Sequence, residues 1–213
     1  MTVDPPAGAY HADGTATVTA TPAPGWTFLK WLGDATGTNL TASVSASRNR
    51  CVQAVFGTAF GATTVGGGGV VRSPVMGLYP YGSSVRLTAV PQLGNYFVFW
   101  GNAATGTNNP LTFTVTTANS TASAVFTSLS GNNCSLSVVA DGLGRVAATP
   151  RANRYIIGTS VTLTTQPDAG QEFLEWGGDA TGTNNPLTLT MSQSKVVTAQ
   201  FYQAPTALDH AMP

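Results

Sequence analysis

Few side chains in this sequence have the type and spacing needed for catalysis. The histidines, His11 and His210, lie near the two ends of the chain, and the glutamates are Glu172 and Glu175. These glutamates lie three residues apart in an expected strand, where alternation would place them on opposite faces and prevent them from pairing as acid and base. The four glycines 66–69 lack the lysine of a phosphate-binding loop. The inventory indicates a protein that is not an enzyme and that uses no cofactor.

Two loops have side chains that calcium could use. The segment Gly-Asp-Ala-Thr-Gly-Thr-Asn contains Asp34 in one copy and Asp179 in another, among hydroxyl and carbonyl oxygens. Calcium takes about six to eight oxygen ligands, usually with several carboxylates. Each loop offers one carboxylate, and in a third copy Asn102 is aligned in its place. An Asx-type turn, in which the side chain bonds its own backbone, needs fewer ligands. We therefore favour a turn over a metal site.

Aromatic residues fall into two groups. Trp26, Tyr96 and Phe99 stand where the other copies of a repeated segment carry Asn, Gln, Thr, Lys or Glu, so we expect them to be exposed. Exposed aromatics mark binding surfaces, here for a sugar ring or for another protein. A second group recurs in every copy and is expected to fill the core: Phe28, Trp31, Phe97, Trp100, Phe173 and Trp176.

The two cysteines, Cys51 and Cys134, lie in different copies of the repeated segment. A disulfide between them requires Cα atoms within about 7 Å of each other and an oxidising compartment. The alternative is a pair of buried thiols that act as small apolar side chains. The sequence favours the thiols and leaves the disulfide open.

The composition excludes several classes of binding protein. Charged residues make up 8% of the 213 residues, and nine basic side chains balance nine acidic ones. The chain thus lacks the clustered positive charge of a nucleic-acid reader or of a protein that binds anionic membranes. No apolar run approaches the roughly eighteen residues of a membrane-spanning helix. The 42% of hydrophobic residues is enough for a packed core.

The elements that must position these residues occur three times. The copies read GWTFLKWLGDATGTN at 25–39, GNYFVFWGNAATGTNNPLT at 94–112 and GQEFLEWGGDATGTNNPLT at 170–188. A threonine-rich strand ending in proline precedes each copy, and an alternating strand ending in phenylalanine follows it. Self-similarity of this kind indicates tandem modules. Apolar residues alternate with threonine, and no helical period is sustained. We therefore predict an all-β protein of three small antiparallel modules, β-sandwich or β-grasp-like, with little or no helix.

We divide the chain into repeat 1 (1–58), repeat 2 (59–130), repeat 3 (131–202) and a linker tail (203–213). Repeat 3 begins with an additional strand after Cys134 that ends at an expected hairpin tip, Asp141-Gly142. Repeat 2 has a counterpart, whereas repeat 1 has none, because Met1 falls inside its second strand. We expect that this chain was excised from a longer protein or that repeat 1 borrows a strand.

The composite pattern resembles the divergent internalin B-repeat family, of the wider Listeria–Bacteroides repeat group. The matching elements are Thr-Ala-x-Pro, Gly-aromatic-x-Phe-x-x-Trp, Gly-Asp-Ala-Thr-Gly-Thr-Asn-Asn-Pro-Leu-Thr and a closing Val-x-Ala-x-Phe. They cover nearly the whole chain up to Tyr202. The resemblance implies a bacterial protein that is secreted or attached to the cell surface. It also implies a non-catalytic spacer or adhesive module beside other domains, and a β-grasp-like fold in the related internalin repeats.

Two functions follow as hypotheses. The first is an extracellular rod of three β-modules that spaces or assembles other domains, with neighbouring domains of a larger polypeptide or copies of itself as partners. In this hypothesis the open edge of repeat 1 could also polymerise by strand pairing. The second is a carbohydrate-binding accessory module of a secreted polysaccharide-active enzyme, with Trp26, Tyr96 and Phe99 as the contact residues.

Overall fold

The computed structural model describes residues 1–6, 10–11 and 14–204. These residues form strands and turns and no helix, which confirms the all-β class. Accordingly, no described segment is a helix that could cross a membrane. The chain divides into two compact units: unit 1 is Met1–Gly61, Pro74–Val85 and Phe113–Thr121, and unit 2 is Ala62–Ser73, Arg86–Thr112 and Ala122–Pro213. Repeat 1 lies in unit 1 and repeat 3 in unit 2, whereas repeat 2 contributes to both.

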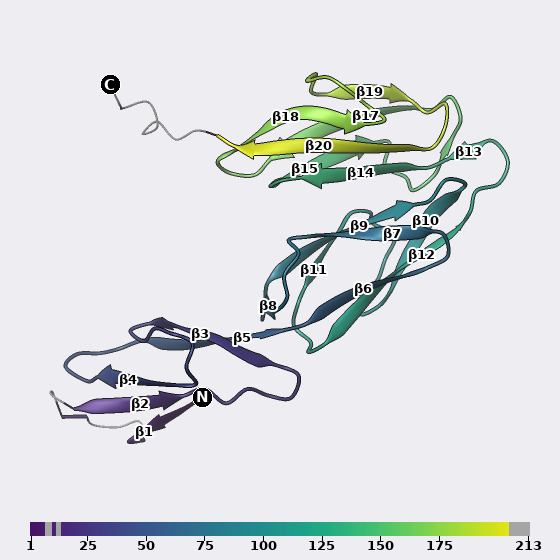
Figure 1. Ribbon diagram of the computed structural model, residues 1–213. Helices are drawn as coiled ribbons and strands as arrows, with labels where there is room; N and C mark the ends of the chain where they lie inside the picture. Colours follow the sequence, from purple (N-terminus) through teal and green to yellow (C-terminus); the bar gives the residue numbers. More distant parts are fainter. Residues whose placement is uncertain (7–9, 12–13, 205–213) are drawn as a thin grey trace, which may run out of the picture. The chain divides into compact units, whose positions relative to one another are not determined.

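Repeat 3 is a sandwich of two three-stranded sheets (Figure 1). One sheet has the order β14-β20-β18, the other has the order β15-β17-β19, and a short pair, β13-β16, closes one end. The strands are β13 (Asn133–Cys134), β14 (Leu136–Asp141), β15 (Gly144–Thr149), β16 (Tyr155–Ile156), β17 (Ser160–Pro167), β18 (Gln171–Gly178), β19 (Leu187–Thr190) and β20 (Lys195–Gln203). Period-2 alternation of apolar residues lets each sheet bury one face against the other.

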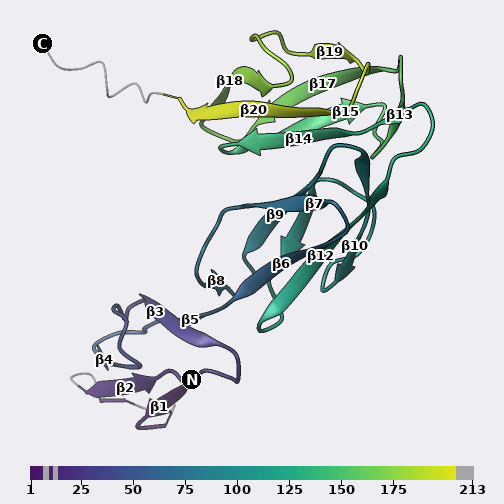
Figure 2. The ribbon, with the colours of Figure 1, turned by 45° about the vertical axis from the view of Figure 1, so that its right-hand side comes forward.

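The pairing of β14 differs from the antiparallel hairpin expected from the sequence. β14 runs parallel to β20, with Val138 opposite Val197 and Ala140 opposite Ala199. β15 belongs to the other sheet, so the turn after Asp141 crosses from one layer to the other. Gly142 has a φ of 93° at this turn, a conformation that suits glycine. The two ends of the chain of repeat 3 thus meet side by side in one sheet (Figure 2).

Repeats 1 and 2 are variants of the same sandwich. In repeat 2 the sheets are β10-β12-β6 and β11-β9-β7; in repeat 1 they are β1-β2-β4 and β3-β5, with β8 of repeat 2 added beside the end of β5. No described strand of repeat 1 stands where β14 stands in repeat 3. The strands are β1 (Thr2–Asp4), β2 (Thr15–Thr19), β3 (Thr27–Gly33), β4 (Thr41–Ser45), β5 (Val52–Thr58), β6 (Phe60–Val65), β7 (Gly68–Ser73), β8 (Tyr79–Pro80), β9 (Ser84–Pro91), β10 (Asn95–Asn102), β11 (Leu111–Thr114) and β12 (Ser120–Ser128).

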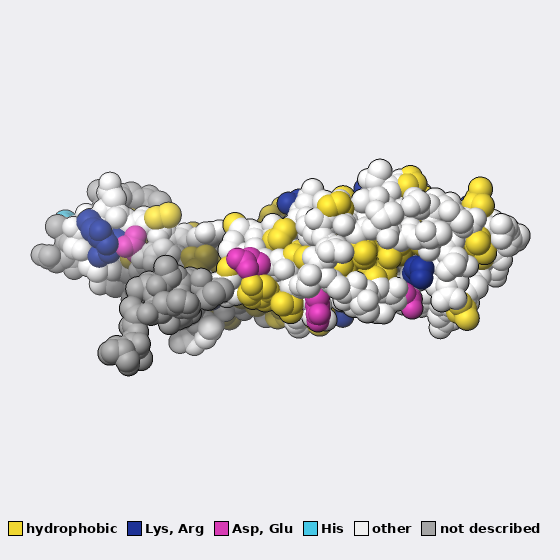
Figure 3. Space-filling model, turned by 90° about the horizontal axis from the view of Figure 1, so that it is seen from above, with side chains coloured by type: hydrophobic (Ala, Val, Ile, Leu, Met, Phe, Trp, Pro, Cys, Tyr) yellow, Lys and Arg dark blue, Asp and Glu magenta, His cyan; other side chains and the backbone are white. Residues whose placement is uncertain are grey.

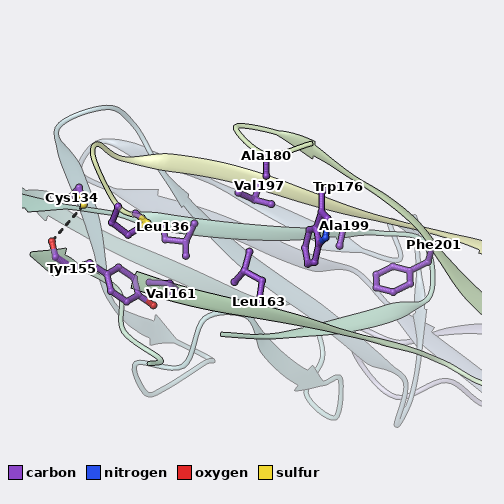
Figure 4. Close-up of a cluster of buried hydrophobic side chains, with 11 residues drawn as sticks. Cys134, Leu136, Tyr155, Val161, Leu163, Trp176, Ala180, Val197, Ala199 and Phe201 are labelled. Atoms are coloured by element: carbon purple, nitrogen blue, oxygen red, sulfur yellow. Dashed lines mark hydrogen bonds between the residues drawn. The ribbon is translucent and has the colours of Figure 1, made fainter. Parts of the chain in front are cut away.

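Each core is built around the tryptophan of its repeat. In repeat 3, Figure 4 shows Trp176 and Ala199 of one sheet pointing towards Leu163 of the other. Trp176 is 2% exposed, and Phe173 packs beside it with ring centroids 5.0 Å apart. The corresponding phenylalanine–tryptophan pairs have centroid distances of 4.9 Å in repeat 2 and 5.0 Å in repeat 1. Phe28, Trp31, Phe97 and Trp100 are buried, and Phe173 is partly buried against the cluster.

A β-bulge allows both aromatics of the Phe-x-x-Trp pattern to face the core. In a regular strand, residues three apart point to opposite faces. The register of β18 against β20 shifts between Phe173 and Glu175, so that Phe173 lies opposite Phe201 and Trp176 lies opposite Ala199. The same shift occurs in β3 and β10. One additional residue in the strand thus brings two large rings onto one side.

The bulge overturns the expectation that Glu172 and Glu175 lie on opposite faces. Glu172 is opposite Tyr202 and Glu175 is opposite Gln200, two positions of one parity, so both glutamates share the outer face of the sheet. Both are exposed. The Tyr202 hydroxyl donates to Glu172 Oε2 at 2.5 Å, and this bond to the carboxylate raises the pKa of Tyr202.

A tyrosine corner explains the proline that stands five residues before a tyrosine in each repeat. The Tyr155 hydroxyl donates to the Pro150 carbonyl oxygen at 2.9 Å and accepts from the Ala152 N–H at 3.1 Å. Tyr79 makes the same two bonds, to Pro74 and Met76. Tyr155 is 5% exposed, and its burial raises the pKa of the hydroxyl. The corner thus fixes the conformation of the segment from Pro150 to Tyr155, which connects β15 to β16.

Loss of this corner should destabilise repeat 3. We expect Tyr155→Phe to lower the free energy of unfolding by about 1–3 kcal/mol, because it leaves a backbone carbonyl and a backbone N–H without their partner. Tyr202→Phe removes an exposed hydroxyl and is the matched control, with an expected change within about 0.5 kcal/mol. Urea denaturation followed by tryptophan fluorescence measures both. Equal losses in the two variants would contradict a structural role for the corner.

Candidate functional site

Each repeat has a loop that folds over its tryptophan. The Trp176 indole N–H donates to the Asn184 carbonyl oxygen at 2.8 Å, and its backbone N–H donates to the Gly182 carbonyl oxygen at 2.8 Å. Trp100 and Trp31 make the same two bonds to their own loops. A buried indole N–H needs such an acceptor. The Thr-Gly-Thr-Asn segment thus supplies the carbonyl oxygens that accept hydrogen bonds from the buried tryptophan, although its residue types suggest a ligand-binding loop.

The loop aspartates bond to a neighbouring strand rather than to their own backbone. Asp179 Oδ2 accepts from the Val196 N–H at 2.7 Å, and the Asp179 N–H donates to the Val196 carbonyl oxygen at 2.8 Å. Asp34 makes the same pair of bonds with Cys51, both at 2.8 Å. The Asx turn expected from the sequence is therefore replaced by a clamp between the loop and the start of the last strand.

Asn102 does not take the place of these aspartates in repeat 2. Asn102 has a positive φ of 61°, and the glycines before the two aspartates, Gly33 and Gly178, have positive φ values of 86° and 74°. Asn102 therefore occupies the position of these glycines. Ala103 is the residue that corresponds to Asp34. The expected alignment of Asn102 with the aspartates was wrong by one position, since Asn102 follows Trp100 by two residues, as Gly33 follows Trp31. Asparagine can take this glycine position because it tolerates a left-handed backbone.

The surroundings of Asp34 are those of a structural carboxylate. Its Oδ1 accepts from Arg50 at 2.8 Å and from Arg48 at 3.3 Å. The Cys51 N–H and Arg50 together hold the pKa of Asp34 below its ordinary value of 3.8. Across residues 1–6, 10–11 and 14–204, no group of three or more His, Cys, Asp or Glu side chains could hold a metal ion.

Tyr96 and Phe99 lie on one outer sheet face in unit 2. The bulge in β10 places Tyr96 opposite Thr127 and Phe99 opposite Val125. Phe99 is 44% exposed. Tyr96 is half-buried, and the Arg154 guanidinium lies 5.2 Å from its ring centroid. One of these rings is therefore free to bind, while the other already has a cationic partner.

Trp26 lies in unit 1 beside an aromatic that the sequence analysis missed. Its ring centroid is 5.5 Å from that of Tyr81, which is 66% exposed. Trp26 itself is half-buried. Tyr81 corresponds to Ile157 of repeat 3, so the criterion of a non-recurring aromatic would have found it. The two rings form a partly exposed aromatic pair, which we call the Trp26–Tyr81 pair.

Both cysteines have free thiols. Cys134 is 1% exposed, and burial raises the pKa of its thiol. Cys51 is exposed at the start of the last strand of repeat 1, which differs from the buried thiol that the sequence favoured. Its backbone groups carry the clamp with Asp34, and its side chain does not fill the core.

A polar cleft of about 290 Å³ lies within unit 2. Arg86, Arg145 and Arg151 line it, above an apolar floor from β14. Arg86 donates to the carbonyl oxygens of Gly144 and Gly142, and burial lowers the pKa of its guanidinium. The Arg86 side chain of repeat 2 thus bonds to the backbone of repeat 3.

Charged side chains are sparse and scattered over the face of the molecule in Figure 3. The repeated sandwich, the tryptophan loops and the backbone-bonded aspartates together define a tandem-repeat β-sandwich protein. Residues 2–59, 61–130 and 134–205 each match the divergent InlB B-repeat domain, and the chain belongs to this family, with three tandem copies. No curated protein and no solved structure matches the chain.

The Asp34 clamp should make stability depend on pH. Because the pKa of Asp34 is lowered on folding, its contribution to stability is complete above a pH of about 4 and is lost as the pH falls through the folded-state pKa. We expect Asp34→Asn to be less stable than the parent chain at pH 7, and the difference to shrink towards pH 2. Thermal unfolding followed by circular dichroism measures this.

Asp168→Asn is the control for the loss of one charge, because the Asp168 carboxylate is exposed and its ion pair with Arg145 is long, at 3.9 Å. A gap between Asp34→Asn and the parent chain that stayed constant from pH 7 to pH 2 would show that the clamp does not depend on the ionised carboxylate.

Proposed function

We propose that this chain is a non-catalytic, extracellular spacer and assembly element of a bacterial surface or secreted protein. Membership of the InlB B-repeat family supports this assignment, as does the neutral composition. The observation that carries the proposal is that consecutive repeats are joined by ordered hydrogen bonds within each compact unit. A spacer needs such junctions because free hinges would leave the distance between its ends undefined.

In unit 1 the last strand of repeat 1 continues into a pairing with repeat 2. Gly57 of β5 pairs with Pro80 of β8, and Thr58 pairs with Tyr79. The Thr58 hydroxyl donates to the Gly25 carbonyl oxygen at 2.7 Å and accepts from the Asn119 N–H at 2.9 Å. Thr58 is 1% exposed. One buried hydroxyl thus bonds to both repeats.

In unit 2 the contacts between repeats 2 and 3 are also polar and ordered. Arg86 of β9 donates to the carbonyl oxygens of Gly142, in the turn after β14, and of Gly144, the first residue of β15. The Asn153 side chain donates to the Thr107 carbonyl oxygen at 2.9 Å. Thr88 and Ser137, from the two repeats, are both nearly fully buried. Small modules with thin cores gain stability from such neighbour contacts.

The proposal predicts that repeats 2 and 3 tumble as one body in solution. ¹⁵N relaxation of the full chain should give a common rotational correlation time for the amides of the two repeats. Arg86→Ala combined with Asn153→Ala should give separate, shorter values, since the bonds of the junction are lost. Arg145→Ala is the control, because its side chain is 72% exposed. Independent tumbling of the two repeats in the parent chain would overturn the spacer role.

A carbohydrate-binding role is the second candidate, and the Trp26–Tyr81 pair favours it. Exposed rings side by side can stack on the apolar faces of successive sugar rings. A single stacking contact corresponds to millimolar affinity, about 4 kcal/mol. Retention on a soluble polysaccharide embedded in a native gel would measure such weak binding.

If this second role holds, Trp26→Ala with Tyr81→Ala should abolish retention and leave the melting temperature unchanged. Tyr96→Ala and Phe99→Ala test the outer face of β10 in the same way. Retention that survives all four substitutions would exclude these surfaces. A lower melting temperature would instead assign the rings to packing.

A further inference from the structure

The cleft of about 290 Å³ in unit 2 gathers positive charge in a chain that has little of it. Arg86, Arg145 and Arg151 line the cleft, and they are three of the nine basic side chains of the whole sequence. Among the described residues that line it, none is acidic. An anion complements such a site, because a carboxylate can accept two hydrogen bonds from one guanidinium.

The positive charge of Arg86 is only partly compensated within the protein. Its guanidinium is half-buried and bonds to the neutral carbonyl oxygens of Gly142 and Gly144. Burial lowers the pKa of this guanidinium, the charge of Asp168 opposes the effect, and the charge of Arg145 adds to it. A half-buried cation that bonds to no described carboxylate favours an anion nearby, since a desolvated charge needs a partner.

Arg145 and Arg151 keep most of their N–H donors available for a ligand. The Arg145 side chain is 72% exposed, and its ion pair with Asp168 is long, at 3.9 Å. The Arg151 side chain is exposed and makes no hydrogen bond or ion pair with a described residue. Both side chains can therefore turn towards a ligand with little loss of existing contacts.

One wall of the cleft is the open edge of β15. In the described part of the chain, β15 pairs with β17 and has no strand on its other side. Gly144 directs its carbonyl oxygen away from β17, to Arg86. Since backbone groups alternate along an antiparallel strand, those of Val146 and Ala148 point to the same side. Both residues line the cleft, and their N–H groups are further donors for an anion.

The remaining lining suits a sugar ring better than a bare ion. Small apolar side chains of β14 and β15 give the cleft an apolar floor: Val138, Ala140, Val146, Ala147 and Ala148. The polar side chains of Thr112, Asn153 and Gln166 also line it and can bond to hydroxyl groups. The cleft volume is at the lower end of the range for ligand sites and admits about one sugar ring. A bare inorganic anion would leave the apolar floor in water.

Repeat 2 carries larger side chains at the corresponding positions. Leu136 and Ala148, which line the cleft, align with Phe60 and Arg72 of repeat 2. Phe60 is 4% exposed and stacks on Phe113, with ring centroids 4.9 Å apart. The cleft therefore depends on residues particular to repeat 3 and not on the shared sandwich alone.

We propose that this cleft binds an acidic sugar, a hexuronate residue of an anionic polysaccharide. Arg145, Arg151 and the edge amides of β15 hold its carboxylate. One face of its ring lies on the alanines of the floor, and its hydroxyl groups bond to the polar lining. This inference goes beyond the spacer role, and it does not depend on the Trp26–Tyr81 pair, which lies in unit 1.

An acidic peptide would fit the cleft less well. The open stretch of β15 begins after Gly144, which bonds to Arg86, and ends at Thr149. Within this stretch Val146 and Ala148 direct their backbone groups outward. A peptide strand would thus form few backbone bonds, whereas a common strand has about five to six residues. A compact ring uses the same N–H groups together with the side-chain donors.

The test uses the full chain and trigalacturonate, a short hexuronate oligomer, with amide chemical shifts followed by NMR. The amides of Val146, Ala148 and Arg151 should shift and saturate with a Kd of about 1 mM or tighter. Fully methyl-esterified trigalacturonate keeps the rings and loses the charge, so it should bind at least about tenfold more weakly. Arg145→Ala and Arg151→Ala should each weaken trigalacturonate binding about tenfold.

Arg154→Ala is the matched control for the loss of one positive charge. Arg154 belongs to the same connection as Arg151, but it does not line the cleft, and its guanidinium lies 5.2 Å from the centroid of the Tyr96 ring. Its variant should bind trigalacturonate within about twofold of the parent chain in about 0.15 M salt, because exposed charges are screened there.

Four results would overturn the inference. The first is the absence of saturating shifts up to about 10 mM trigalacturonate. The second is equal binding of the methyl ester, which would exclude the carboxylate as the recognised group. The third is an equal loss in Arg154→Ala, which would indicate diffuse charge attraction. The fourth is saturation of the same amides by triglutamate but not by trigalacturonate, which would assign the cleft to an acidic peptide.

The two roles proposed above are tested by different measurements. The common tumbling of repeats 2 and 3 in the parent chain does not depend on a ligand, and retention through Trp26 and Tyr81 concerns unit 1. Failure of the acidic-sugar site is therefore distinguishable from failure of the spacer role.

Discussion

Burial of one tryptophan in each repeat, with its indole N–H bonded, is the constraint on which the rest of each sandwich depends. A module of about seventy residues has a thin core, so the largest side chain provides a large share of the buried area. Trp176 can be buried because the Asn184 carbonyl accepts its N–H. That bond fixes the path of the loop. The bulge in β18 then brings Phe173 to the same side and completes the aromatic layer.

The loop that accepts hydrogen bonds from the tryptophan is also hydrogen-bonded to the last strand. In repeats 1 and 3 the aspartate of the loop holds both the N–H and the carbonyl oxygen of one residue at the start of that strand. Repeat 2 has Ala103 at this position, so the tryptophan bonds are the shared element and the clamp is an addition. The carboxylates of Asp34 and Asp179 accept hydrogen bonds from backbone N–H groups, which gives them a structural role in these loops.

Closure of the sandwich in repeats 2 and 3 depends on a strand from the start of the repeat that lies beside the strand from its end. This arrangement brings β14 next to β20 in parallel. It also makes the repeats interdependent, since the end of β5 pairs with β8 of the following repeat. A chain built in this way joins its modules through the sheets themselves.

The sequence by itself determined the three repeats, the family and the all-β class, because these follow from alternation and recurrence along the chain. It also separated the recurring aromatics from the non-recurring ones. Only the tertiary structure decided the β14–β20 parallel pair, the bulge that brings Glu172 and Glu175 to one face, and the contact of Trp26 with Tyr81. A bulge shifts the register of a strand against its partner and so changes which residues face the core. The Trp26–Tyr81 contact joins residues of two repeats. Neither relation is encoded in the spacing of residues along a single strand, since both arise from long-range backbone pairing.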